Sequence, residues 1–332
     1  MYKEKIDILM ATYNGEKYLK EQIDSILNQT YSNFDLYISD DFSNDSTTQI
    51  LKEYSEKDDR IKLILNDQNY GSNENFKKLL KHVKSKYFMF ADQDDVWLND
   101  KIEKTFNKLV IDKSDLVFTD LKVVDSELNT IHESFNMLKK YKNKILKCLN
   151  KPNLVYLYNV VTGCTIMCKS KFIEQFLQIK SNDKNILHDH ILPLIVSQNG
   201  KVSYLNEITI LYRQHGNNQV GTKRYVDRFE KFDDVREHLI DVKIRLFEMY
   251  VNNNAIFKDD INNLNKNALD YFYNISKKKN LNFKNWKIFY ILYKNETISY
   301  FVLYFIIMNF PCIAKLGYKL KNLFKNKGCA KK

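Results

Sequence analysis

Residues 86–95 read Lys86-Tyr-Phe-Met-Phe-Ala-Asp-Gln-Asp-Asp95, an apolar and aromatic run that ends in three carboxylates within four residues. Such a run predicts a buried strand, so the acidic cluster is expected at the carboxyl edge of a sheet, where open α/β sheets bind ligands. Carboxylates this close repel each other unless a cation lies between them. Hard oxygen ligands in small number suit Mg²⁺ or Mn²⁺. The stretch favours a metal–diphosphate site, and the alternative is an acidic turn that caps a following helix.

The segments on both sides alternate between strand-like and helix-like patterns. Before residue 86, strands are expected at 6–11, 34–39 and 61–65, and helices at 19–29, 47–57 and 75–84. After residue 95, the start of a helix is expected at 96–102 and strands at 115–120, 160–168, 202–205 and 208–213. A helix is expected around 187–196, and helical patterns continue from residue 225. Strands that alternate with helices predict an α/β fold with a mostly parallel sheet.

Charge is distributed unevenly along the 332 residues, whose net charge is +11. From Lys277 to Lys332 there are 13 Lys and one acidic residue, a balance of +12 that leaves −1 for the first 276 residues. A nucleic-acid binder more often spreads its basic face over the folded domain, so no nucleic-acid partner is expected.

The basic tail is also aromatic and apolar. Residues 298–314 are almost continuously apolar, but 17 residues fall short of the roughly 20 that a spanning helix needs. Basic and apolar residues then alternate over 315–327. This pattern favours a segment that lies in the interface of an anionic membrane. A helix packed on the main domain and a true membrane span are the alternatives.

Cysteine usage and the N-terminus indicate a cytosolic chain. The five cysteines form no metal-ligand or disulfide framework, and Cys164 and Cys168 are expected in the core as reduced thiols. The sequence enters a strand at Ile6, so no signal peptide is expected. We therefore expect a cytoplasmic protein that is peripheral at the inner face of the cell membrane.

Four motifs, in this order, resemble family 2 glycosyltransferases. They are Met-Ala-Thr-Tyr-Asn-Gly at 10–15, Ser-Asp-Asp-Phe-Ser-Asn-Asp-Ser-Thr at 39–47, Asp-Gln-Asp-Asp-Val-Trp at 92–97, and His188-Asp189. With Tyr-Arg-Gln-His-Gly-Asn-Asn at 212–218, the set is most similar to the bacterial rhamnosyltransferase branch. The resemblance implies a GT-A fold over residues 1–221, with a nucleotide-sugar half at 1–110 and an acceptor half at 111–221. Residues 222–332 would form a helical region with the interfacial tail from about residue 277.

The resemblance also implies site residues. Asp94 would bind the metal together with His215, and Asp189 would be the general base. Asp95 would orient a sugar hydroxyl or support the site, and Arg213 would contact the diphosphate or metal. The residues assigned to the nucleotide-sugar are Ala11, Thr12, Tyr13 and Asp40, at the base and ribose, Asp92 on the ribose side of the acidic motif, and Asp95, Arg213 and His215.

Each assignment has a structural alternative. Asp189 alone could cap the following helix. His188 and His190 are expected as local hydrogen-bonding groups. Arg213 could form an ordinary surface ion pair, and the Tyr-Asn of the first motif could be turn residues.

These features lead to an enzyme hypothesis. A divalent ion stabilises the leaving diphosphate, and a carboxylate accepts the proton of the attacking hydroxyl. One base without a second carboxylate nucleophile implies inversion. We expect a transferase that moves L-rhamnose from dTDP-L-rhamnose to a lipid-linked saccharide of a surface polysaccharide. The alternatives are a UDP-hexose or UDP-N-acetylhexosamine donor, a haloacid-dehalogenase-type phosphatase, and a non-catalytic membrane-binding module. A homodimer is left open.

Overall fold

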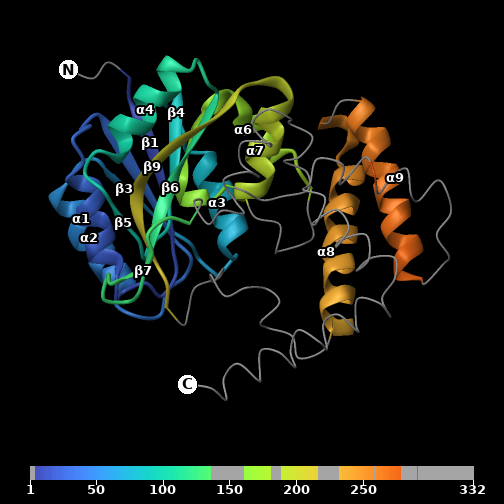
Figure 1. Cartoon of the computed structure of the whole chain (residues 1–332). Coiled ribbons are helices and arrows are strands. Elements are labelled where there is room, and N and C mark those ends of the chain that lie inside the picture. Colours follow the sequence, from blue (N-terminus) through green and yellow to red (C-terminus); the bar gives the residue numbers. More distant parts are fainter. Residues whose placement is uncertain are drawn as a thin grey trace, which may run out of the picture. The chain divides into compact units, whose positions relative to one another are not determined.

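The computed structural model describes residues 4–135, 161–180, 188–215, 232–256 and 259–277, together with Tyr290 (Figure 1). The chain divides into two compact units. The first comprises Met1–Ile179 and Lys184–Val220, and the second comprises Lys180–Asp183 and Gly221–Lys332. The motifs quoted above all lie in the first unit.

One sheet forms the centre of the first unit. Its strands are β1 (Ile6–Thr12), β2 (Phe34–Asp40), β3 (Ile61–Leu65), β4 (Tyr87–Ala91), β5 (Val96–Trp97), β6 (Leu116–Val124), β7 (Thr130–His132), β8 (Ile166–Lys169) and β9 (Val202–Arg213). They are ordered β3-β2-β1-β4-β8-β6-β9-β5, and β7 pairs with β6. Every residue of β4 is buried, as expected for a strand in the middle of a covered sheet.

The sheet is mixed, which corrects the prediction of a mostly parallel one. β1, β2, β3 and β4 are parallel to their neighbours, with Thr12 opposite Asp40 and Met10 opposite Ala91. β8 is antiparallel to both β4 and β6, whereas β9 is parallel to β6. β5 pairs antiparallel with β9, and β7 pairs antiparallel with β6. Regular α/β alternation stops after β4, and the later strands form antiparallel pairs as well as the parallel pair of β6 and β9.

Helices cover the sheet (Figure 1). Those of the first unit are α1 (Leu19–Leu27), α2 (Thr47–Lys57), α3 (Ser72–Leu80), α4 (Lys101–Ile111), α6 (Ile173–Leu177) and α7 (His188–Asn199), with 3₁₀ turns at Gly163–Thr165 and Ser170–Phe172. Helix α1 buries Leu19, Ile23 and Ile26, whose spacing places them on one face. These side chains join Ile8 and Ile38 of the sheet in the main core.

Most predicted elements before residue 92 are confirmed, although α3 spans Ser72–Leu80 rather than the expected 75–84. The larger differences follow residue 92. Residues 96–97 form strand β5 rather than the start of a helix, and α4 begins only at Lys101. The predicted strand at 160–168 is a strand only from Ile166, because a 3₁₀ turn comes first. The two strands expected at 202–205 and 208–213 are one strand, β9, with shifts of register against β6.

The second unit contains α8 (Phe232–Asn252), a 3₁₀ turn at Asn254–Ile256 and α9 (Asp259–Ser276). The rings of Phe247 and Phe272 stack with centroids 5.7 Å apart, so the two helices share a small core. Among the helices that the structure describes, none is long and apolar enough to cross a membrane. The predicted interfacial segment at 298–327 lies outside the described residues.

Candidate active site

The acidic loop, defined as Asp92–Asp95, joins β4 to β5 at the carboxyl edge of the parallel half of the sheet. Gln93 ties this loop to the turn after β1. The Tyr13 main-chain N–H donates to Gln93 Oε1 (2.8 Å), and Gln93 Nε2 donates to the Tyr13 carbonyl (3.1 Å). Gly15 permits the close approach, because a Cβ there would lie 2.4 Å from Gln93 Oε1. The first and third motifs are therefore one structural unit.

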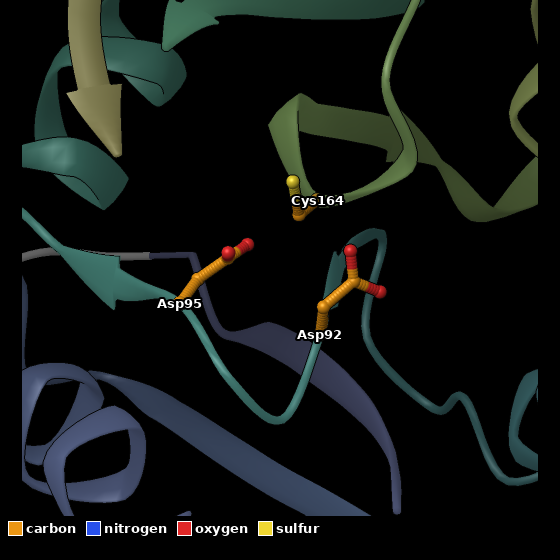
Figure 2. Close-up of side chains that lie close together, drawn as sticks. All are labelled: Asp92, Asp95 and Cys164. Atoms are coloured by element: carbon orange, nitrogen blue, oxygen red, sulfur yellow. The ribbon is translucent and has the colours of Figure 1, made fainter. Parts of the chain in front are cut away.

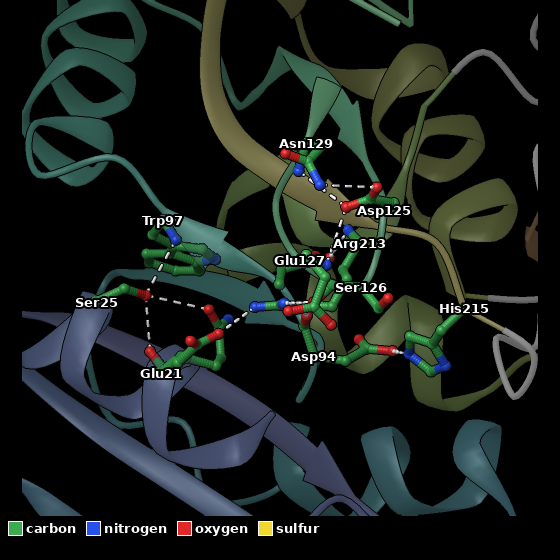
Figure 3. Close-up of polar contacts among 12 residues, drawn as sticks. Glu21, Ser25, Asp94, Trp97, Asp125, Ser126, Glu127, Asn129, Arg213 and His215 are labelled. Atoms are coloured by element: carbon green, nitrogen blue, oxygen red, sulfur yellow. Dashed lines mark hydrogen bonds and ion pairs between the residues drawn. The ribbon is translucent and has the colours of Figure 1, made fainter. Parts of the chain in front are cut away.

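Asp94 and His215 meet on one side of the loop. His215 Nε2 lies 2.8 Å from Asp94 Oδ2, and both side chains keep 16% exposure, so the pair can be reached from solvent (Figure 3). The ring of Tyr18 packs on the His215 ring with centroids 4.9 Å apart, which restricts the imidazole. A carboxylate and an imidazole held together are donors that a divalent transition ion accepts.

Arg213 is buried behind this pair and binds protein groups. Its Nε donates to the Asp94 carbonyl (2.9 Å), its Nη1 to the Ser126 carbonyl (2.6 Å), and its Nη2 to the Glu21 carboxylate (Figure 3). Its main-chain N–H donates to Asp95 Oδ1 (3.1 Å). The structural alternative of an ordinary surface pair is excluded, since the Arg213 side chain is 1% exposed and its ion pair with Glu21 is part of this buried set of contacts. Arg213 connects α1, the acidic loop and the turn after β6.

Asp92 and Asp95 face Cys164 on the other side of the loop. One ligand atom from each of the three lies within 4.8 Å of the others (Figure 2). Burial, with the nearby charges of Asp94 and Asp189, raises the pKa of Asp92 from 3.8 to about 7. Burial and the charges of Asp94 and Asp92 raise the pKa of Asp95 well above its usual value. Asp95 Oδ2 is buried and has no hydrogen-bond partner in the described part of the chain. The environment of both carboxyl groups therefore disfavours their charged form.

Lys101 is a buried cation at the start of α4. Its Nζ lies 4.8 Å from the centre of the Trp97 ring and 3.5 Å from Thr209 Oγ1. Burial lowers the pKa of Lys101 to about 8, and the charges of Cys164 and Asp95 oppose that shift. Lys101 therefore supplies positive charge beneath the acidic loop, without reaching solvent.

Thr12 and Asp40 join the ends of β1 and β2. The buried Asp40 carboxylate accepts hydrogen bonds from the Thr12 hydroxyl (2.9 Å), the Ser43 main-chain N–H (2.9 Å) and the Ser43 hydroxyl (2.6 Å). Ala11 is half-buried and Tyr13 is 45% exposed. The residues assigned to the base and ribose thus lie together at one edge of the sheet.

Asp189 is in the first turn of α7, and its charge acts on Asp92, so the two carboxyl groups face the same site. The neighbouring His188 points into the core. Its ring lies between Phe76 and Phe90, with centroids 4.3 and 4.5 Å away, and within the described residues neither of its nitrogens has a hydrogen-bond partner. The prediction that His188 is a local hydrogen-bonding group is wrong, because the residue is enclosed by rings.

Sequence reasoning missed several residues of this site. Gln93 was read only as the spacer of the acidic motif, and Cys164 only as core. Lys101 carried no signal, because a lysine in an amphipathic helix usually points to solvent. Gly163 beside Cys164 was the available clue to a close approach, and a Cβ at Gly163 would lie 2.4 Å from His188 Nε2.

A mixed α/β sheet with an acidic loop at its carboxyl edge, and a histidine after β9 that contacts this loop, is the GT-A-like arrangement of a transferase. The chain belongs to glycosyl transferase family 2, whose sequence profile matches residues 7–176. It is a glycosyltransferase, and the phosphatase and the non-catalytic module are set aside on this ground.

Individual proteins agree with the family. The dTDP-rhamnosyl transferase RfbG of Shigella flexneri is 33% identical over 224 residues, which cover 64% of this chain and 73% of that protein. The Staphylococcus aureus TarS fragment 1–349 in complex with UDP-GlcNAc superposes with a TM-score of 0.56, at 18% identity, over 81% of this chain and 72% of that one. The mannosyltransferase PcManGT of Pyrobaculum calidifontis, in complex with GDP-Man and Mn²⁺, superposes with a TM-score of 0.52 at 12% identity. The superposition covers 90% of this chain and 77% of that one. The two structures show the same fold.

Proposed function

We propose that this chain is a metal-dependent, inverting glycosyltransferase that takes its sugar from a nucleotide-sugar. The observation that carries the proposal is the Asp94–His215 pair, in which Asp94 Oδ2 and His215 Nε2 are 2.8 Å apart. Asp94 lies on the acidic loop, which Gln93 fastens to the turn after β1. This connection lets one rigid edge hold both ends of a nucleoside diphosphate, with the nucleoside near Thr12 and the diphosphate near Asp94.

The acidic residues fit a divalent cation. Burial and the charge of Asp94 raise the pKa of both Asp92 and Asp95, and Asp95 Oδ2 is buried without a partner among the described residues. A cation would lower this repulsion. Asp94 and His215 would hold Mg²⁺ or Mn²⁺, which would stabilise the negative charge that develops on the departing diphosphate. Asp95 would support the loop through its bond with the Arg213 main chain.

Asp189 would act as the general base. Its charge contributes to the raised pKa of Asp92, so an acceptor hydroxyl bound on the face of the donor next to Asp189 could lose its proton to this carboxylate. Attack from that face would displace the diphosphate directly, with inversion at the anomeric carbon. Asp40 would fix the backbone beside the nucleoside, because its carboxylate accepts hydrogen bonds from Thr12 and Ser43.

The donor we propose is dTDP-L-rhamnose, supported by the similarity to the dTDP-rhamnosyl transferase RfbG. A UDP-hexose or UDP-N-acetylhexosamine is the alternative, supported by the fold shared with the TarS complex with UDP-GlcNAc. We propose a lipid-linked saccharide as acceptor, and residues 1–221 as the catalytic part. Residues 222–332 would place it at the inner face of the membrane through the basic and apolar tail.

Nucleotide binding tests the donor. Thermal unfolding is measured with dTDP, UDP, GDP and CMP, each with and without Mn²⁺, and then turnover is measured for any donor that stabilises. A ligand at about 100 times its dissociation constant adds about 2.7 kcal/mol of stability. Stabilisation by dTDP that requires Mn²⁺ supports the proposal, and a preference for UDP changes the sugar. No response to any nucleotide overturns it.

Two variants separate binding from chemistry. Asp94→Asn should lose the metal-dependent part of dTDP binding, whereas Asp189→Asn should keep donor binding and lose transfer. Asp35→Asn is the matched control, because Asp35 pairs with Lys5 (2.6 Å) at the start of β2, on the opposite edge of the sheet. Turnover that persists in Asp189→Asn would place the base elsewhere.

A further inference from the structure

Phe42 has an unusual backbone and an unusual exposure at the same time. Its φ is +66°, a left-handed conformation that costs a bulky residue about 1–3 kcal/mol and that Gly or Asn adopts more easily. Its side chain is 59% exposed. An aromatic ring at this position therefore strains the backbone, and exposing it adds no core packing. Strain held this way is a reason to look for a ligand.

The residues on both sides of Phe42 are fixed. The Asp41 carboxylate accepts hydrogen bonds from the Tyr70 N–H (3.0 Å) and the Gly71 N–H (2.7 Å). Ser43 donates its N–H and hydroxyl to Asp40. The left-handed turn is thus imposed by buried carboxylates, and the ring is presented from a rigid frame.

The turn that carries Phe42 lies against the turn that carries Tyr13. The Asp41 N–H donates to the Thr12 carbonyl (2.8 Å), and the Asn14 N–H donates to the Ser43 hydroxyl (2.9 Å). Each turn carries one exposed aromatic residue between its hydrogen-bonded positions. Tyr13 is 45% exposed in one turn, and Phe42 is 59% exposed in the other. Two exposed aromatic side chains are therefore held at the same edge, beside Thr12 and Asp40.

We propose that Phe42 is a base-stacking residue that helps determine affinity for the nucleotide, an inference that rests on the proposed function. Every nucleobase has an apolar face that stacks on an aromatic side chain. Phe42 follows β2, which is separated from β4 by β1, whereas Cys164 lies in the turn that leads into β8, the neighbour of β4 on its other side. The ring therefore belongs to the nucleoside side of the site and not to the acceptor side.

The test compares Phe42→Gly, Phe42→Ala and Phe42→Trp with the parent chain. Binding of dTDP and of inorganic pyrophosphate, both with Mn²⁺, is measured by titration calorimetry. Stacking predicts that dTDP affinity falls at least about 5-fold in the Gly and Ala variants and is restored by Trp. Pyrophosphate has no base, so its affinity should stay the same in all three. Ile111→Ala, at a residue 77% exposed at the end of α4, should change neither.

Thermal stability gives a second, independent readout. Phe42→Gly should raise the melting temperature by about 2–4 °C, because it removes the left-handed strain, and Phe42→Ala should not. Affinity for dTDP that is unchanged in the Gly and Ala variants overturns the inference, and so does an equal loss of pyrophosphate binding. A higher KM for the acceptor with dTDP binding intact also overturns it. A parent chain that binds no nucleotide overturns the proposed function as well.

Discussion

Arg213 is the residue on which the shape of the acidic loop depends. Its three guanidinium contacts reach Glu21, Asp94 and Ser126, which belong to three separate segments. Two of the three acceptors are main-chain carbonyls. Only a guanidinium, whose N–H groups point in several fixed directions, can reach all three acceptors together. The guanidinium is buried, so water cannot replace a lost contact.

We expect Arg213→Lys to destabilise the protein by roughly 2–4 kcal/mol, because one ammonium cannot replace the fork. Metal-dependent nucleotide binding should weaken as well, since the Asp94 main chain is released. Urea unfolding gives the free energy. Arg245→Lys is the control, because Arg245 pairs with Asp241 on the exposed face of α8 and should cost about 0.5 kcal/mol or less. Equal costs at the two positions would refute this role for Arg213.

His188 makes the stability of the protein depend on pH. Burial between two phenylalanine rings lowers the pKa of His188 to about 3 in the folded chain, against about 6.5 when unfolded. Between these values the unfolded state binds a proton that the folded state does not. The contribution of neutral His188 is thus fully present above about pH 6.5, and it falls by up to about 1.4 kcal/mol for each pH unit below.

We therefore expect His188→Leu to flatten the pH dependence of unfolding. Between about pH 6.5 and pH 5 the parent should lose about 2 kcal/mol relative to the variant. Urea titrations across this range measure the difference, which removes the contributions of carboxylates common to both chains. His132→Leu, at an exposed position of β7, controls for the substitution itself. Parallel curves for parent and His188→Leu would contradict the enclosure of a neutral histidine.

At the scale of elements, the turn after β1 and the acidic loop behave as one unit through Gly15 and Gln93. A methyl group at Gly15 would overlap Gln93 Oε1, so Gly15→Ala should destabilise the protein by about 1–3 kcal/mol and weaken nucleotide binding. In a Gln93→Ala background the overlap is absent. The cost of Gly15→Ala should then fall by about 1 kcal/mol or more, which a double-mutant cycle measures. Additive costs would show that the two elements are independent.

The elements that the sequence predicted are those whose pattern is local. Strands β1, β2 and β3 and helix α2 have contiguous apolar runs or helical spacing, and each was expected within one residue at either end. Strand β5 exists because Val96 and Trp97 pair with Leu211 and Ile210, which no local pattern could indicate. The antiparallel placement of β8 between β4 and β6 is likewise determined by pairing with strands that are distant in the sequence.

The candidate site divides in the same way. Asp94 and His215 were expected near one metal, and the structure places them 2.8 Å apart, although their role as ligands stays a prediction. The contacts of Arg213 and Gln93 were not predicted, because most of their partners are main-chain groups, which carry no sequence signature. The burial of Lys101 was not predicted either, since it depends on contacts with Trp97 of β5 and with Thr209 of β9, which is distant in the sequence.

At the scale of the whole molecule, charge is separated along the chain. The first 276 residues are nearly neutral, and the last 56 carry the excess of lysine together with the 17-residue, almost continuously apolar run. Each lysine near an anionic surface contributes about 1 kcal/mol to attraction, and buried apolar area adds a contribution that salt does not screen. A tail with both features should hold the enzyme where a lipid-linked acceptor lies.

Removing residues from Ile298 onward should therefore move the protein from the membrane fraction to the supernatant and leave dTDP binding unchanged. Sedimentation with vesicles that contain phosphatidylserine measures the first effect, and calorimetry measures the second. A variant with Lys315, Lys319, Lys321, Lys325 and Lys327 changed to Gln separates the two forces. It should bind vesicles more weakly and lose most of the salt dependence, because the apolar run remains. Truncated protein that still sediments would place the membrane contact elsewhere, and truncated protein that no longer binds dTDP would show that the tail supports the fold.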